Sequence, residues 1–319
     1  MASADTTTTA AGGLSARGSG AKERLGDRIF SSAATAAGVT ILGVLAGVAI
    51  FLLIEALPAI NADAAELPEG KSLVDYIAPL AFGTVLAGTL AIIIAVPLAI
   101  AVALFISHIA PRRLAQPLSY VVDLLAAIPS IVYGLWGAIV LGPSCVGIMD
   151  WLAENLGFLP FFEGPPSATG RTMFVAGIVL AVMILPIISA VCREVFSQTP
   201  KRLQEGALAL GATRWEMIRT TVLPFGRSAL ISSSMLGLGR ALGETMAVAI
   251  ILSSSGGVTF NLISSGNPST IASNIALDFP EASGVTVNAL IASGFVLFLI
   301  TLLVNVGARA VIARQQAVE

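Results

Sequence analysis

Residues 205–212 read Glu205-Gly206-Ala207-Leu208-Ala209-Leu210-Gly211-Ala212, and a polar, amphipathic run then leads to Leu223-Pro224. This water-soluble segment lies between two long apolar runs. The apolar run that follows it carries two charged residues four positions apart, Arg240 and Glu244. A long polar loop followed by charges inside an apolar run is typical of a transport protein. An anchor, a receptor or a soluble enzyme has no need of that combination.

The composition places most of the chain in a lipid membrane. Hydrophobic residues make up 56% of the chain and charged residues 11%, and the mean hydropathy is +0.90. Soluble domains carry about 25% charged residues. The 31 glycines favour close packing of helices within a bilayer. The net charge of −2 gives no indication of nucleic-acid binding, so membrane lipid is the expected environment and no nucleic acid is an expected partner.

Hydropathy predicts an all-α fold, a polytopic membrane bundle of six transmembrane helices. A helix needs about 20 mostly apolar residues to cross the bilayer. The runs long enough to do so cover residues 33–57, 78–107, 118–142, 172–193, 228–252 and 286–308. Pro97, Pro129 and Pro186 lie inside the second, third and fourth runs, where proline bends or interrupts a helix.

Four segments follow from these runs. Residues 1–28 form a polar tail that we expect to be disordered and cytoplasmic, and residues 29–77 hold the first membrane helix and an outer loop. Residues 78–308 form a core of five membrane helices that includes a cytoplasmic loop at 195–227. Residues 309–319 form a cytoplasmic C-terminal tail.

The basic residues indicate the orientation, because Lys and Arg concentrate on the cytoplasmic side of membrane proteins. One set of loops and tails holds most of them: Arg17, Lys22, Arg24, Arg28, Arg112, Arg113, Arg193, Lys201, Arg202, Arg214, Arg219, Arg227, Arg309 and Arg314. The opposite loops hold Lys71 and Arg171 among many carboxylates. We therefore predict that both termini are cytoplasmic. Cys145 then lies outside and Cys192 inside, which predicts no disulfide.

The loop at 195–227 has the capping signals of two short helices. Thr199-Pro200 suits a helix start, and Gly211 suits the left-handed residue that ends a helix. Thr213 and Glu216 have the spacing of a capping box for a second helix, which Pro224 is expected to end. This predicts a rigid docking element for a cytoplasmic partner. The alternative is an amphipathic connector that rests on the membrane surface.

The motifs Glu205-Gly206-Ala207, Gly211-Ala212 and Leu223-Pro224 resemble the EAA loop of binding-protein-dependent ABC importer permeases. The chain departs from that pattern at Gly206 and Thr221. The resemblance covers residues 78–308 and implies a type I importer permease with a MetI-like core. It also implies that the loop at 199–224 docks on an ATPase subunit. The residues implied in ATPase coupling are Glu205, Gly206, Ala207, Gly211, Ala212, Arg214, Trp215 and Pro224.

Two further segments, 125–134 and 239–248, are similar to the permeases of high-affinity phosphate importers, of the PstC type rather than the PstA type. The resemblance implies a multi-pass protein of the bacterial inner membrane that forms half of a phosphate path. It implies three partners: a second, PstA-type permease, a dimer of cytoplasmic ATPases, and an extracytoplasmic phosphate-binding protein. It implies that this chain is not an enzyme and binds no cofactor, with ATP and Mg used by the ATPase.

Arg240 is the main candidate for contact with substrate. An arginine at the bilayer centre costs about 2.5–3.5 kcal/mol on insertion scales, so it has to face the bundle interior or water. Its planar guanidinium can donate two hydrogen bonds to one oxyanion. Glu244 is predicted one turn further on the same face. The alternative is a structural Arg240–Glu244 ion pair. The candidate pathway residues are Arg240, Glu244, Ser233, Gly237, Thr245 and Asp123.

Weaker candidates complete the prediction. Asp123 fits packing and pathway equally, and His108 is expected at the membrane interface. Residues 268–278 are predicted to form a short external helix that touches the binding protein. Other functions remain open: a permease for molybdate, sulfate or phosphonate, an ion-coupled secondary carrier, and a membrane scaffold for phosphate sensing.

Overall fold

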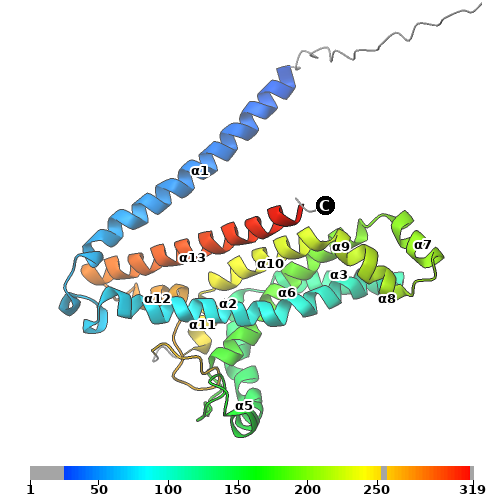
Figure 1. The fold of residues 1–319 in the computed structure, drawn as a ribbon. Helices are drawn as coiled ribbons and strands as arrows, with labels where there is room; N and C mark the ends of the chain where they lie inside the picture. The colour runs from blue at the N-terminus through cyan, green and yellow to red at the C-terminus, as the bar shows by residue number, and fades with distance from the viewer. Residues whose placement is uncertain (1–24, 253–256, 317–319) are drawn as a thin grey trace, which may run out of the picture. The chain divides into compact units, whose positions relative to one another are not determined.

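The computed structural model describes residues 25–252 and 257–316, and these residues contain helices and no strand (Figure 1). The α-helices are α1 (Leu25–Ile60), α2 (Leu73–Leu104), α3 (Arg112–Ala126), α4 (Ser130–Trp136), α5 (Gly142–Leu156), α6 (Met173–Ser197), α7 (Lys201–Ala209), α8 (Arg214–Met217), α9 (Leu223–Phe225), α10 (Arg227–Leu242), α11 (Met246–Ile251), α12 (Ile271–Asp278) and α13 (Val285–Gln316). Two 3-10 turns, η1 (Ala64–Glu66) and η2 (Pro68–Gly70), and three π-helical turns, η3 (Phe105–Ile109), η4 (Gly137–Leu141) and η5 (Ile218–Val222), join them.

The chain divides into two compact units, residues 1–48 and residues 49–319. Within the first unit, the described residues belong to the first part of the apolar helix α1, and residues 26–48 are exposed. The predicted tail at 1–28 lies outside the described residues up to position 24, and α1 begins at Leu25. The second unit holds every other helix, and with them the features analysed below.

Among the described residues, five helices are long and apolar enough to cross a membrane: 26–60, 73–109, 130–156, 173–197 and 285–310. They confirm four of the predicted spans and relocate the third. The fifth predicted span, 228–252, is present as two helices, α10 and α11, which are separated at Gly243–Thr245. The all-α membrane bundle is thus confirmed, with one of its six crossings broken.

The predicted span at 118–142 is wrong as a continuous helix. α3 ends at Ala126, and α4 begins after Pro129, whose backbone is extended with φ −58° and ψ 139°. Proline removes a backbone donor and disfavours helical conformation in the residue before it. α3 is amphipathic, and the spanning helix starts only at Ser130. Pro186, by contrast, does not interrupt α6.

The core of the second unit is the contact between α2 and α6. Within α2, every fourth residue from position 87 to position 103 is a buried alanine: Ala87, Ala91, Ala95, Ala99 and Ala103. None of them is more than 1% exposed. Such small side chains let two helix backbones approach closely. On α6, a Cβ added to Gly177 would lie 2.9 Å from Cβ of Leu90, which shows how tight the contact is.

The two ends of this unit carry different short helices, with α12 at one end and α7 and α8 at the other (Figure 1). α12 confirms the short helix predicted at 268–278. Its first residue, Ile271, donates its backbone N–H to the hydroxyl of Thr84 at 3.0 Å, and the Tyr76 hydroxyl donates to the Asn274 amide oxygen at 2.8 Å. Both bonds attach α12 to α2.

The alanine face yields a packing prediction. We expect Ala99→Leu to destabilise the protein by about 1–3 kcal/mol, because a larger side chain cannot enter a contact with no free space. Ala101→Leu makes the same change at an exposed position of the same helix and should have little effect. To compare them, each variant is purified in detergent and heated to a series of temperatures. Size-exclusion chromatography then measures the fraction that has aggregated at each temperature. Equal aggregation midpoints would contradict the prediction.

Candidate functional site

Two helices that each follow a break in the chain, α4 and α11, pack against each other in the second unit. The break between α3 and α4 lies at 127–129, and the break between α10 and α11 lies at 243–245. α4 packs against α11 without any side chain between them, because a Cβ added to Gly134 would lie 2.7 Å from the Cα of Ala247. The two segments that resemble phosphate permeases, 125–134 and 239–248, are therefore in direct contact.

Polar contacts hold each break in place. The hydroxyl of Tyr133 donates to the backbone carbonyl of Leu125 at 2.8 Å, which ties α4 to the last turn of α3. The backbone N–H of Ala247 donates to the Glu244 carboxylate at 3.3 Å, which satisfies an amide at the start of α11. Glu244 is only 8% exposed.

Arg240 lies in the last turn of α10 and lines a cavity of about 590 Å³. Its side chain is exposed. The cavity is lined by Ile187, Ser232, Met235, Leu236, Gly239, Arg240, Asn305, Ala308 and Arg309. Gly239 contributes empty space, because a Cβ added there would meet nothing within 4 Å.

The structural Arg240–Glu244 ion pair, the alternative to a substrate contact, does not form among the described residues. Among the described residues, ion pairs within 4.0 Å join Lys71 to Glu69 and Arg193 to Asp123, and neither involves Arg240. The prediction assumed one continuous helix, in which residues four apart share a face. α10 ends at Leu242, so Glu244 lies outside that helix and faces the start of α11 instead.

The remaining predicted pathway residues of α10 face α6 rather than the cavity. Ser233 is 1% exposed, and its hydroxyl contacts the Cys192 thiol at 3.3 Å. A Cβ added to Gly237 would lie 2.8 Å from Cδ1 of Ile188. Thr245 lies in the break and donates its hydroxyl to the carbonyl of Gly243 at 3.2 Å. The structure therefore does not bring these three residues together with Arg240.

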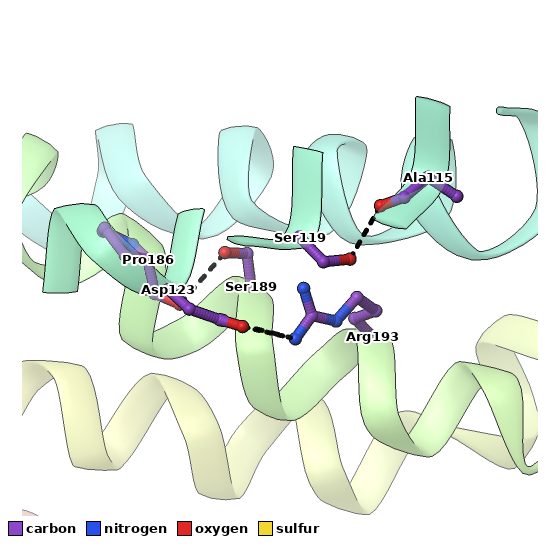
Figure 2. A network of polar contacts seen from close by, with 6 residues as sticks. All are labelled: Ala115, Ser119, Asp123, Pro186, Ser189 and Arg193. Carbon is purple, nitrogen blue, oxygen red and sulfur yellow. Dashed lines mark hydrogen bonds and ion pairs between the residues drawn. The ribbon is translucent and has the colours of Figure 1, made fainter. Parts of the chain in front are cut away.

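Asp123 connects α3 to α6. Figure 2 shows its carboxylate facing the guanidinium of Arg193, with an N–O distance of 3.3 Å. The second terminal nitrogen of Arg193, Nη1, is buried and has no hydrogen-bond partner among the described residues. Neighbouring hydroxyls bond within their own helices, from Ser119 to the carbonyl of Ala115 and from Ser189 to the carbonyl of Pro186 (Figure 2). Asp123 does not line the cavity of Arg240.

The loop at 195–227 forms the turn that the sequence predicts at Gly211. Gly211 has φ +87°, in the left-handed region. Its N–H donates to the carbonyl of Leu208 at 3.0 Å, and the N–H of Ala212 donates to the carbonyl of Ala207 at 3.1 Å. These two bonds define a Schellman motif, in which glycine takes the left-handed position. The pairs Ala207–Ala212 and Leu208–Gly211 thus set the angle between α7 and α8.

The second helix of the loop begins as predicted and ends differently. Thr213 and Glu216 form a capping box, and hydrogen bonds from Thr213 hold the pKa of the Glu216 carboxyl below its usual value. Pro224 does not end the helix: it lies at the first positions of α9, where a missing N–H costs nothing. At the other end, α7 is preceded by Pro200, not by a Thr199 cap.

Large apolar side chains of this loop face solvent. Trp215 is 61% exposed and Leu210 is 91% exposed, and Leu203 and Leu208 add to the same loop. Glu205, Gly206 and Arg214 are exposed as well, while Ala207 and Ala212 are half-buried. Exposed apolar groups of this size on a capped, rigid loop are typical of a docking surface.

The chain matches the family model of the binding-protein-dependent transport system inner membrane component over residues 95–316. The chain belongs to this family. As a member of this family, the protein is a multi-pass component of an inner membrane.

Curated relatives share most of the chain. It is 48% identical over 300 residues to the phosphate transport system permease protein PstC 2 of Mycobacterium tuberculosis, which covers 90% of this chain and 92% of that protein. It is 46% identical over 240 residues to the phosphate transport system permease protein PstC of Haemophilus influenzae, which covers 73% and 75%. A bacterial ABC transporter involved in alginate import matches with a TM-score of 0.52 and 18% identity over 73% of this chain and 79% of that chain, which supports the fold alone.

Gly211 provides a test of the loop geometry within this family. We expect Gly211→Val to distort the turn between α7 and α8 and to lower ATP-dependent transport, because a β-branched residue is strained at φ +87°. Gly211→Asn should retain most activity, since asparagine tolerates this conformation. ATP-dependent transport and co-purification of the ATPase are measured together. Similar transport activity of the two variants would show that backbone strain at position 211 is not the cause of the loss.

Proposed function

We propose that this chain is the permease subunit of an ATP-driven importer of inorganic phosphate and forms half of its translocation path. The proposal rests on the two relatives described above, at 48% and 46% identity, which are named as phosphate transport system permeases. The contact between segments 125–134 and 239–248 supports it, because these phosphate-permease-like motifs pack together beside Arg240.

Arg240 is the proposed substrate contact. Its guanidinium lines a cavity and has no ion-pair partner within 4.0 Å among the described residues. An unpaired guanidinium can donate two parallel hydrogen bonds to one phosphate. Glu244 has a separate role in the proposal: its buried carboxylate stabilises the start of α11 and thereby keeps the break beside Arg240 open.

The proposed partners occupy the two ends of the bundle. A dimer of ATPases docks on the α7–α8 loop through Trp215, Leu210 and the exposed residues around them. An extracytoplasmic phosphate-binding protein lies over the α12 end, and a PstA-type permease completes the path. ATP and Mg belong to the ATPase, so this chain is a permease subunit and not an enzyme. Both termini are cytoplasmic in this arrangement.

Other functions have less support. A permease for molybdate, sulfate or phosphonate has the same fold and the same kind of arginine, but the curated relatives described here are named for phosphate. An ion-coupled carrier needs no ATPase-docking loop. A phosphate-sensing scaffold is compatible with transport, and no separate feature of the described residues favours it.

Reconstitution tests the proposal directly. The chain is assembled with its second permease, ATPase and binding protein in vesicles, and ATP-dependent uptake of radiolabelled phosphate is measured. We expect uptake that an excess of sulfate or molybdate does not inhibit. Uptake of one of those anions in place of phosphate would establish the rival permease assignment.

Arg240→Gln tests the substrate contact. We expect phosphate uptake to fall at least tenfold, about the loss of one charge-assisted hydrogen bond, while the complex still assembles and hydrolyses ATP. Arg240→Lys keeps the charge without the planar fork and should be intermediate. Arg113→Gln removes an exposed arginine of α3 and should behave like the wild type. Normal uptake by Arg240→Gln would refute the assignment.

The orientation is tested with introduced thiols, because both native cysteines are buried. Ser228→Cys and Ser283→Cys make the same change at exposed positions at opposite ends of the bundle. A membrane-impermeant maleimide applied to intact cells should label only Ser283→Cys. Labelling of Ser228→Cys instead would reverse the topology.

A further inference from the structure

The cavity beside Arg240 holds a second arginine that the substrate proposal does not use. Arg309 of α13 lines the same cavity, together with Asn305 from the preceding turn and Ser232 of α10. The cavity residues of α13, at 305, 308 and 309, share one face of that helix, and those of α10 do the same. The sequence alone assigned Arg309 only to the basic inner side of the membrane.

The two arginines converge because their helices are antiparallel. α10 runs from its inner end at Arg227, and α13 runs back toward that end (Figure 1). Side chains on a helix lean toward the N-terminus of that helix. Arg240 therefore leans inward and Arg309 leans outward, so both guanidiniums point toward the space between them.

This space is positively charged and has free hydrogen-bonding capacity. Among the described residues, no carboxylate lies within 4.0 Å of either guanidinium. The described contacts leave the Asn305 amide without a hydrogen-bond partner. The Ser232 hydroxyl donates to the carbonyl of Ser228 at 2.8 Å and keeps its lone pairs. Two like charges facing one cavity repel each other unless an anion lies between them.

The cavity lies near the inner surface of the membrane. A rise of about 1.5 Å per residue puts Arg309 about 36 Å along α13 from Val285, beyond the hydrocarbon core of about 30 Å. Arg240 lies closer to the membrane centre. An anion held between the two arginines is therefore on the cytoplasmic side of Arg240.

We propose that Arg309 and Asn305 of α13 form, with Arg240 of α10, an inner phosphate site that receives the anion after Arg240 and before release to the cytoplasm. The inference rests on the proposed function and adds the second helix and the direction of transfer. Arg309 supplies a second charged fork, and Asn305 supplies neutral donors. The bound group is a phosphate-type oxyanion, with the transported ion as its source.

The test uses the assembled permease–ATPase complex in nanodiscs, without the binding protein, and measures equilibrium binding of radiolabelled inorganic phosphate. Discs of phosphatidylcholine alone exclude anionic lipid, and parallel discs contain phosphatidylglycerol. We expect Arg309→Gln to weaken phosphate binding about tenfold in both kinds of disc. Arg309→Lys should retain part of the affinity, and Arg113→Gln should retain all of it.

Asn305→Asp provides a second variant if Arg309→Gln does not assemble. It keeps the size of the side chain and places a carboxylate beside Arg309, so phosphate binding should be lost. Absence of phosphate binding in the wild type, or unchanged binding in both variants, would overturn the inner site. Wild-type binding that is weaker in discs with phosphatidylglycerol, and that Arg309→Gln restores, would overturn it as well, because it would identify a competing lipid headgroup as the ligand at Arg309.

Uptake by the complete wild-type transporter separates this inference from the proposed function. If the wild type imports phosphate and Arg309→Gln imports and binds it equally well, only the inner site fails. If the wild type imports no phosphate, the proposed function fails.

Discussion

The close contact of α2 with α6 is the constraint on which the other helices depend. Alanine at every fourth position of α2, from Ala87 to Ala103, gives α2 a buried face of small side chains, which lets the two helices approach closely. α6 then offers its other faces to α10, at Gly237, and to α3, at Arg193. α6 also leads directly into the α7–α8 loop, so any shift of that loop acts on the most buried spanning helix of the second unit.

The two breaks place a charged group inside an apolar bundle. Because α10 stops at Leu242, Arg240 lies in the last turn of that helix. Its side chain lines a cavity. Glycine at 134 lets α4 lie directly on α11, the helix that follows the break. The carboxylate of Glu244 accepts a hydrogen bond at the start of the short helix α11. The position of α11 therefore depends both on this hydrogen bond and on its packing against α4.

Local signals in the sequence were sufficient where the structure depends on neighbours in the chain. Hydropathy located the membrane helices, Gly211 predicted a left-handed turn, and Thr213 with Glu216 predicted a capping box. Hydropathy could not locate the breaks at 127–129 and 243–245, because apolar residues lie on both sides of each. The Arg240–Glu244 ion pair was an alternative only because the break at 243–245 was not recognised. The partner of Asp123 lies 70 residues away, and no local pattern identifies a contact between separate helices.

The contact between α3 and α6 includes an ion pair and is weaker than the close packing of α2 on α6. The Asp123 carboxylate is 48% exposed, and an ion pair of that kind contributes up to about 1 kcal/mol, which is less than twice the thermal energy RT. The buried Nη1 of Arg193 adds no bond within the described residues. This ion pair is thus a contact that salt can screen and thermal motion can open, whereas the buried alanine face of α2 contains no charged group. The bundle therefore combines a close-packed contact between α2 and α6 with a weaker ionic contact between α3 and α6.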